Sequence, residues 1–355
     1  MSAGNPARAV RDEDAFDVDA VAAWLDRGPI AGCRQFRGGA SNLTYLLQYD
    51  DPQPDLILRR PPPGTKARGA HDMGREHDVQ AALAPVSPQV PAMVGHCADE
   101  SVIGSEFYVM EKVDGAIPRQ DFGFPVTPEQ ADALCDAAVD TLVALHSVDV
   151  AAIPALSALD RGDGYVARQV GGWSRRFADA RTDDTGDWSD VLGWLAEHQP
   201  RDVRRGMVHN DFRLDNLVLD PDTLAVRAVL DWEMATVGDP LMDLGGALAY
   251  WVEAGDDEVF QLFRRQPTTA PGMWTRERVV AAYVERSGLA LPTGPGGADG
   301  WRFYEVFGLF RLAVIAQQVW YRYAHGQTTN EAYAVFGPAV GYLEGRCRDR
   351  IAAGA

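Results

Sequence analysis

Lysine and cysteine are both scarce in this chain of 355 residues. Lys66 and Lys112 are the only lysines, so arginine carries almost all of the positive charge. The four cysteines, at positions 33, 97, 135 and 347, show none of the close spacings that are typical of metal sites or redox pairs. We therefore expect reduced and mostly buried thiols.

Long apolar runs are also missing. The first 18 residues are polar and acidic, and the most apolar C-terminal run, residues 307–320, is interrupted by Arg311. Neither segment is typical of a signal peptide or a membrane span. We expect a cytoplasmic protein without a transmembrane helix.

Positive charge is in deficit as well. The chain has 51 acidic and 33 basic residues, a formal net charge of −18, and an isoelectric point near 4.7. Such a charge repels nucleic acids and anionic membranes, so neither is an expected partner. The composition, 46% hydrophobic and 24% charged, is that of a soluble globular protein, and the length suits two lobes.

One polar loop lies between two apolar runs. Within residues 207–219, the side chains His209, Asp211 and Asn216 follow the spacing H-x-D-x-x-x-x-N. Phosphoryl transfer from ATP needs a carboxylate that orients and deprotonates the attacking hydroxyl, an amide oxygen for one metal ion, and a second carboxylate for the metal between the phosphates. Asp211, Asn216 and Asp231 can fill these roles. The alternative is a polar turn joining two buried strands.

This loop and the segment 231–233 resemble the catalytic loop and metal-binding segment of the aminoglycoside phosphotransferase and choline kinase-like family, which is related to protein kinases. Similarity to the branch that includes the kinase domains fused to some acyl-CoA dehydrogenases lies in residues 38–44, 56–62, 307–313 and 321–326. The resemblance covers nearly the whole chain. It implies an α+β, bilobal protein-kinase-like fold, with a small five-stranded antiparallel sheet lobe and a larger, mainly helical lobe.

The predicted domains follow from this resemblance and from the apolar pattern. Residues 1–16 lack periodic apolar positions, which indicates a mobile N-terminal arm. Residues 17–113 would form the nucleotide-binding lobe, and residues 114–355 the catalytic and substrate-binding lobe. Period-two apolar patterns and turn residues predict small-lobe strands at 33–36, 43–48, 56–59, 94–97 and 107–111.

Glycines 38 and 39 lie between the first two predicted strands, where a kinase covers the ATP phosphates. The segment lacks the G-x-G-x-x-G pattern of protein kinases. The resemblance implies that backbone N–H groups of residues 39–42, beginning at Gly39, hold the phosphates together with the side chains of Ser41 and Asn42. An ordinary hairpin turn is the alternative.

Two adjacent arginines end the third predicted strand. The period of two places Arg59 on one face and Arg60 on the other. The resemblance implies that Arg59 points at the phosphates in place of the protein-kinase lysine. Glu76, in a helix predicted over residues 70–83, would be its acidic partner or a plain surface charge.

The segment after the fifth predicted strand resembles the hinge between kinase lobes. The resemblance implies that the carbonyl of Glu111 and the N–H of Val113 would contact the adenine base. These are backbone contacts, so the side chains carry little information about them.

Two basic residues and a carboxylate belong with the catalytic loop. Arg213 stands where protein kinases carry a lysine on the transferring phosphate, and its alternative is an ion pair within the loop. We expect His209 to brace the loop and Asp243 to accept hydrogen bonds from its backbone. His146 is expected to be a structural histidine.

The resemblance implies an enzyme that uses ATP and Mg²⁺ to phosphorylate the hydroxyl of a small molecule, with GTP as an open alternative to ATP. Arg311 and Arg322 favour an anionic or acyl-type acceptor such as a hydroxyacyl-CoA. The alternatives are an aminoglycoside phosphotransferase and a nucleotide-binding pseudokinase. No long activation segment follows Asp231, which favours a small-molecule acceptor over a polypeptide.

Overall fold

The computed structural model describes residues 7–36, 42–62, 72–293 and 300–353. The chain divides into two compact units. Unit 1 comprises residues 1–137 and 214–235, and unit 2 comprises residues 138–213 and 236–355. These units are defined by packing, so the functional division after residue 113 stays a prediction.

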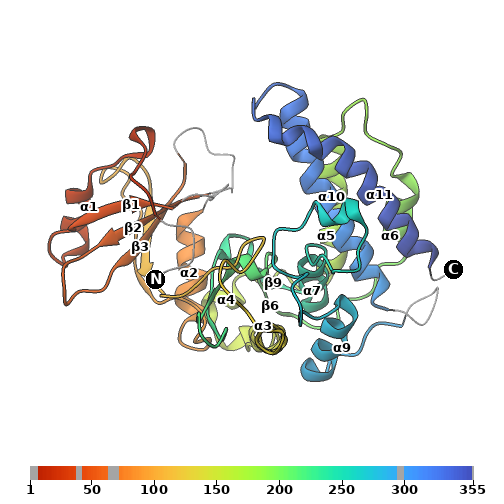
Figure 1. Cartoon of the computed structure of the whole chain (residues 1–355), viewed down its shortest axis with the longest axis horizontal. Coiled ribbons are helices and arrows are strands. Elements are labelled where there is room, and N and C mark those ends of the chain that lie inside the picture. Colours follow the sequence, from red (N-terminus) through yellow and green to blue (C-terminus); the bar gives the residue numbers. More distant parts are fainter. Residues whose placement is uncertain (1–6, 37–41, 63–71, 294–299, 354–355) are drawn as a thin grey trace. The chain divides into compact units, whose positions relative to one another are not determined.

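Unit 1 is built on a five-stranded antiparallel sheet, as predicted (Figure 1). Its strand order is β1-β2-β3-β5-β4, and each neighbouring pair is antiparallel. The strands are β1 (Gly32–Gln35), β2 (Leu43–Gln48), β3 (Leu56–Arg60), β4 (Met93–Cys97) and β5 (Phe107–Glu111). Every predicted strand is present, with its ends shifted by at most one residue.

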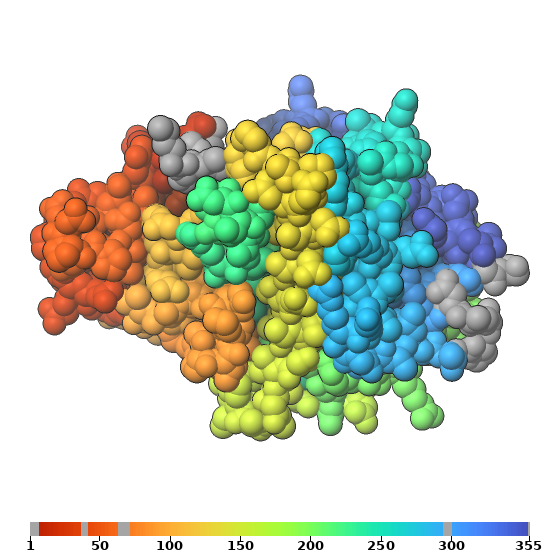
Figure 2. Space-filling model, turned by 60° about the horizontal axis from the view of Figure 1, so that its bottom comes forward, coloured from red at the N-terminus to blue at the C-terminus, as the bar shows by residue number. Residues whose placement is uncertain are grey.

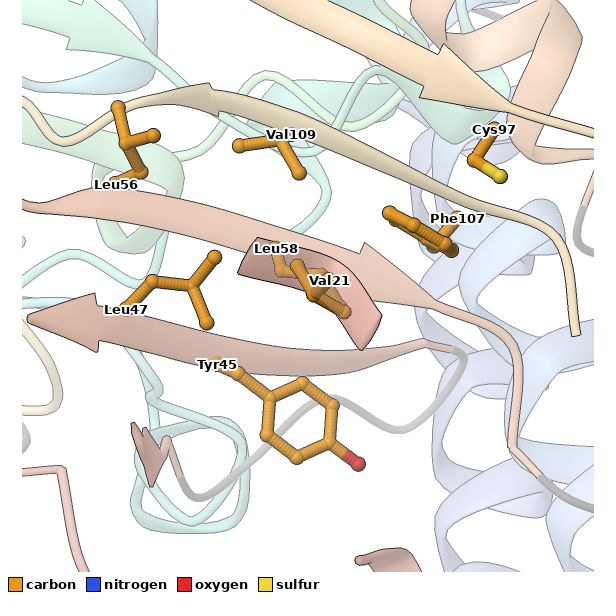
Figure 3. Packing of buried hydrophobic residues seen from close by; sticks show 8 residues of the cluster. All are labelled: Val21, Tyr45, Leu47, Leu56, Leu58, Cys97, Phe107 and Val109. Carbon is orange, nitrogen blue, oxygen red and sulfur yellow. The ribbon is translucent and has the colours of Figure 1, made fainter. Parts of the chain in front are cut away.

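Two helices cover opposite faces of this sheet. One core joins α1 (Val18–Leu25) to the strands through Val21, Tyr45, Leu47, Leu56, Leu58, Cys97, Phe107 and Val109 (Figure 3). On the other face, Met73 of α2 (Met73–Leu83) packs with Ile57 and Tyr108. Each such side chain contributes about 1.5–3 kcal/mol on full burial. Successive side chains of a strand point to opposite faces, so Arg59 and Arg60 of β3 lie on different faces of the sheet.

Part of the N-terminal segment, for which a mobile arm over residues 1–16 was predicted, contacts the sheet. Arg8 pairs with Gln35 as an antiparallel bridge, and a short 3₁₀ helix, η1, spans Asp12–Asp14. The buried carboxylate of Asp14 accepts a hydrogen bond from the Gln35 amide at 2.8 Å. Hydrogen bonds of polar groups therefore hold this segment. It has no periodic apolar residues from which such packing could have been predicted. Residues 1–6 lie outside the described part of the chain.

The remainder of unit 1 is a set of short elements. An antiparallel bridge joins Ala116 to Leu219 and brings the chain after β5 against the 214–235 segment. A Cβ on Gly115 would lie 2.5 Å from the Leu219 carbonyl oxygen, so this approach requires glycine. The short elements are η3 (Leu214–Asn216), β7 (Leu217–Leu219), β8 (Val226–Val229) and η4 (Trp232–Met234).

Unit 2 is mainly helical, apart from the paired strands β6 (Gly206–Val208) and β9 (Thr236–Gly238). Its longer helices are α5 (Tyr165–Asp179), α6 (Ser189–Glu197), α7 (Pro240–Leu248), α9 (Arg276–Ser287), α10 (Arg302–Ala324) and α11 (Phe336–Ala352). Its shorter elements are η2 (Val150–Ala152), α4 (Pro154–Ser157), α8 (Glu258–Gln261) and η5 (Glu331–Val335), and α3 (Pro128–His146) contributes residues to both units. At the C-terminal end, η5 leads directly into α11.

Small residues allow α7 and α10 to pack closely. A Cβ on Gly245 would lie 2.5 Å from the Tyr304 carbonyl oxygen, and one on Gly308 would lie 2.2 Å from the Gly245 carbonyl oxygen. Figure 2 shows α9 at the surface next to α3, where Arg286 and Asp140 form an ion pair at 2.8 Å. Along the described ranges, no helix is long and apolar enough to cross a bilayer. The cysteines are free, and three of the four are buried, as predicted.

Candidate active site

In unit 1, the guanidinium of Arg59 joins two carboxylates. It donates to Glu76 Oε1 at 2.6 Å and to Asp231 Oδ1 at 3.0 Å. The side chains of Arg59 and Glu76 are 9% and 1% exposed, whereas that of Asp231 is 35% exposed. The pairing of Arg59 with Glu76 is as predicted. The exposed carboxylate of Asp231 is the part of this cluster that a ligand can reach.

Glu76 is held from several sides on α2. The Tyr108 hydroxyl donates to Glu76 Oε1 at 2.8 Å, and the Asn42 amide donates to Oε2 at 3.3 Å. Burial raises the pKa of Glu76, and Arg59 and the Tyr108 hydroxyl partly offset this effect. Sequence reasoning missed Tyr108, because a tyrosine on a central strand is most simply a core residue. The network fixes the position of Glu76 and therefore that of Arg59.

Arg60 points to the other face of the sheet, as the strand period predicted. It donates to the Tyr45 hydroxyl at 3.2 Å and to the Asp14 carbonyl at 2.7 Å, and it lies over the ring of Phe16. Arg60 thus stabilises the N-terminal segment. Of the two arginines, only Arg59 belongs to the candidate site.

The two candidate metal ligands lie near each other in unit 1. The N–H of Leu230 donates to the backbone carbonyl of Asn216 at 2.8 Å, directly before Asp231. Asp231 has φ +71°, a left-handed conformation that is uncommon for a residue other than glycine. Such conformations persist where the surroundings enforce them, and they cluster at functional sites.

The donor atoms of these residues fit a magnesium ion. A carboxylate and an amide offer the hard oxygen atoms that Mg²⁺ prefers. In the part of the chain that the structure describes, no group of three or more His, Cys, Asp or Glu could hold a metal. Mg²⁺ typically binds through one or two protein carboxylates together with substrate phosphates.

The loop that carries Asp211 belongs to unit 2 and is organised by Asp243. The N–H groups of His209 and Asn210 donate to the Asp243 carboxylate at 2.6 and 2.8 Å. His146 Nε2 lies 3.1 Å from the same carboxylate, and its Nδ1 lies 2.7 Å from the Tyr283 hydroxyl. Burial alone would raise the pKa of Asp243, but the hydrogen bonds from the His146 ring and the His209 N–H, with electrostatic interactions of both rings, lower it. The supporting roles predicted for Asp243 and His146 are confirmed.

Within the same loop, Asp211 and Arg213 lie beside each other. Arg213 Nε is 3.5 Å from Asp211 Oδ1, and the guanidinium lies 4.8 Å from the centre of the Tyr250 ring. The side chains of Asp211 and Arg213 are 25% and 20% exposed, so both reach the surface. The N–H of Asp211 donates to His209 Nδ1 at 3.2 Å, a contact that supports a bracing role for His209.

Arg311 takes a position that the sequence did not predict. It is buried on α10, donates to the Asn210 carbonyl, and lies 5.2 Å from the Trp173 ring. A Cβ on Gly246 would lie 2.6 Å from Arg311 Nη1, so glycine leaves the arginine room to pass. Arg311 therefore supports the loop that carries Asp211, through the Asn210 carbonyl. Arg322 is exposed near the end of α10.

Some of the remaining residues that were predicted to contact the nucleotide lie in the described part of the chain. Glu111 ends β5, and Val113 lies in the loop that follows it. Asn42 is buried and also donates to Glu233 Oε2 at 3.4 Å. Gly39 and Ser41 lie outside the described residues. The role of each of these residues in nucleotide binding stays a prediction.

The five-stranded antiparallel sheet of unit 1 and the helices of unit 2 are those of a protein-kinase-like fold. The model of the phosphotransferase enzyme family matches residues 32–280, and the chain belongs to this family. The mouse protein named acyl-CoA dehydrogenase family member 10 is 35% identical over 331 residues, which cover 91% of this chain. This chain spans 30% of the length of that relative. The family and fold predicted from the sequence are confirmed.

Solved structures agree with this assignment. A Ralstonia eutropha protein described as a candidate aminoglycoside phosphotransferase is 28% identical, with a TM-score of 0.79, covering 96% of this chain and all of the other. Choline kinase from Cryptosporidium parvum shares the fold at 12% identity, with a TM-score of 0.59 and coverage of 91% and 90%. The chain thus shares the fold of the phosphotransferase enzyme family to which it belongs.

Proposed function

We propose that this enzyme transfers the γ-phosphoryl group of ATP to a hydroxyl group of a small molecule. The hydroxyl oxygen would form a bond to the γ-phosphorus while the bond from that phosphorus to the bridging oxygen breaks, and ADP would leave. Asp211 would orient the hydroxyl and accept its proton. The Arg59 guanidinium, which contacts both Glu76 and Asp231, is the single observation that carries the proposal.

Four side chains would serve the phosphates, either directly or through the metal ion. Arg59 is held by Glu76 and keeps a permanent positive charge, which suits contact with phosphate oxygens. Arg213, next to Asp211 and over Tyr250, would stabilise charge on the transferring group. Asn216 and Asp231 would hold Mg²⁺, whose charge, when the ion is bound, neutralises the phosphates. Asp231 would then exchange its hydrogen bond with Arg59 for the metal.

The first test is phosphoryl transfer from γ-labelled ATP. The purified protein is incubated with Mg²⁺ and a panel of hydroxylated metabolites, hydroxyacyl-CoAs and aminoglycosides, with GTP replacing ATP in a parallel series. We expect labelled product with at least one acceptor and none when EDTA replaces the metal. Nucleotide binding without transfer to any acceptor would instead favour the pseudokinase alternative.

For the acceptor we propose an acyl-type metabolite, such as a hydroxyacyl-CoA. The proposal rests on the 35% identity to the relative named as an acyl-CoA dehydrogenase family member. Arg311 no longer supports it, because its guanidinium is bound to the Asn210 carbonyl. An aminoglycoside is the second candidate, favoured by the 28% identity to the Ralstonia eutropha protein. Efficient phosphorylation of an aminoglycoside and of none of the hydroxyacyl-CoAs would favour the aminoglycoside as acceptor.

A further inference from the structure

One arginine of α2 reaches the backbone just after the candidate metal ligand. Arg75 donates from Nη1 to the Glu233 carbonyl at 3.1 Å and from Nη2 to the Ala235 carbonyl. These carbonyls belong to the turn η4 and to the residue that ends it. A guanidinium presents parallel N–H donors in a rigid fork, so one side chain can fix both carbonyls. The chain from residue 233 to residue 235 is thereby attached to α2.

This turn decides where Asp231 points. Asp231 immediately precedes η4, and its left-handed φ of +71° requires support from neighbouring structure. On one side the Leu230 N–H donates to the Asn216 carbonyl at 2.8 Å, and the Trp232 indole donates to the Val229 carbonyl at 2.8 Å. These contacts hold the residues before and within the turn. Arg75 supplies the contacts that hold its end.

The same turn of α2 also serves Arg59. Glu76, the residue after Arg75, forms the 2.6 Å contact with the Arg59 guanidinium. The Asp72 side chain caps α2 by accepting from the Arg75 N–H at 2.9 Å, which fixes the start of the helix. Adjacent residues of one helical turn therefore hold the arginine and the segment that carries Asp231.

We propose that Arg75 is a positioning residue for Asp231 and that α2 couples the nucleotide-contacting arginine to the metal-binding carboxylate. The inference rests on the proposed role of Asp231 in binding magnesium. Arg75 touches neither substrate nor metal; it acts by holding the turn. Its loss moves the Asp231 carboxylate and lowers the affinity that magnesium adds to nucleotide binding.

Calorimetry with the non-hydrolysable ATP analogue AMP-PNP tests this without using activity. Dissociation constants are measured with Mg²⁺ and with EDTA for the wild type, Arg75→Ala, Arg75→Lys and Asp231→Ala. Arg34→Ala is the matched control, because Arg34 is an exposed arginine on β1 of the same unit. Melting temperatures are recorded for every variant.

We expect the ratio of the AMP-PNP affinity with Mg²⁺ to that with EDTA to fall about tenfold or more in Arg75→Ala, as expected for the loss of charge-assisted hydrogen bonds. The affinity measured with EDTA should change little. Arg75→Lys should fall less, because one ammonium replaces the two-pronged contact. Arg34→Ala should match the wild type. Should Arg75→Ala fail to fold, the ratio for Arg75→Lys decides.

Three results would overturn the inference. In the first, the Arg75 variants keep the wild-type ratio of affinity with Mg²⁺ to affinity with EDTA, while Asp231→Ala gains no affinity from magnesium. The proposed function then stands, and only the role of Arg75 is wrong. In the second, Arg75→Ala weakens binding equally with and without magnesium, which indicates a general structural role. In the third, the wild type gains no affinity from magnesium, and the proposed function fails as well.

Discussion

Asp231 in unit 1 and Asp243 in unit 2 are both carboxylates bound to a basic side chain, but their exposure differs. Asp231 accepts from Arg59 while 35% of its side chain stays exposed, whereas Asp243 and its partner His146 have no exposed side-chain surface. Asp243 also accepts two backbone N–H groups. An exposed carboxylate can exchange its partner for a ligand, while a buried one with every acceptor occupied can only support its neighbours.

This difference in exposure predicts which substitutions affect ligand binding and which affect stability. Removing Asp231 should affect ligand binding with little loss of stability, because water can replace its hydrogen bond. Removing Asp243 should affect stability first, since two backbone N–H groups would lose a buried acceptor. Arg59 and Arg60 differ in their contacts, because Arg59 donates to Asp231 whereas Arg60 donates to the Asp14 carbonyl.

Asp211→Asn should lower the turnover number by about a thousandfold or more, because an amide cannot accept the proton of the attacking hydroxyl. The melting temperature and the affinity for AMP-PNP should change little, since Asp211 is partly exposed. Steady-state kinetics on the first acceptor found with labelled ATP provide the measurement. Near-normal turnover would remove Asp211 from its proposed role.

Asp243→Asn should reduce the free energy of unfolding by roughly 3 kcal/mol, as expected when a buried, hydrogen-bonded charge is removed from its partners. Turnover should fall as well, because His209 and Asn210 lose the acceptor that orders their loop. Urea denaturation at pH 7 measures the first effect. A fully stable variant would show that the buried carboxylate is not the support we describe.

The difference in stability between the wild type and Asp243→Asn should depend on pH, because the pKa of Asp243 is lowered in the folded protein. A carboxyl whose pKa is lower in the folded than in the unfolded state stabilises the fold above its ordinary pKa, near 4. This contribution is lost as the pH falls through the folded-state value. The stability gap between the wild type and Asp243→Asn should therefore be full at pH 7 and shrink below about pH 4. A gap that widened in acid would contradict the assignment.

Arg59→Ala should raise the Michaelis constant for ATP by about tenfold or more, as expected for the loss of charge-assisted contacts. Arg60→Ala should leave that constant unchanged and instead lower stability, because Arg60 anchors the Asp14 carbonyl and the Tyr45 hydroxyl. Kinetics and denaturation on both variants make a matched pair. Equal changes in the Michaelis constant would indicate that the two arginines are not functionally distinct.

The parts of the molecule that follow from short-range patterns were predictable from the sequence. Alternation along residues 56–60 separated Arg59 from Arg60, and the spacing around His209 indicated the catalytic loop. Asp243 was also identified as the acceptor for that loop, and the structure confirms it. The separation of the two arginines was predictable because it depends only on the period of a strand, whereas the catalytic role of the loop around His209 stays a prediction.

The failures concern long-range polar contacts. Arg311 was expected to bind an anionic acceptor, but it donates to a carbonyl 101 residues away in sequence. The contacts of the segment from Arg8 to Asp14 with Gln35, Tyr45 and Arg60 were not predicted either. No local pattern specifies which distant carbonyl an arginine will meet. The contacts of Tyr108 and Arg75 were missed for the same reason.

The most direct measurement is the affinity of Mg²⁺-AMP-PNP for the wild type and for Asp231→Ala by calorimetry. We predict that magnesium strengthens binding to the wild type and that Asp231→Ala loses this gain while keeping a melting temperature close to that of the wild type. Unchanged affinity for the magnesium complex in a folded Asp231→Ala variant would contradict the account.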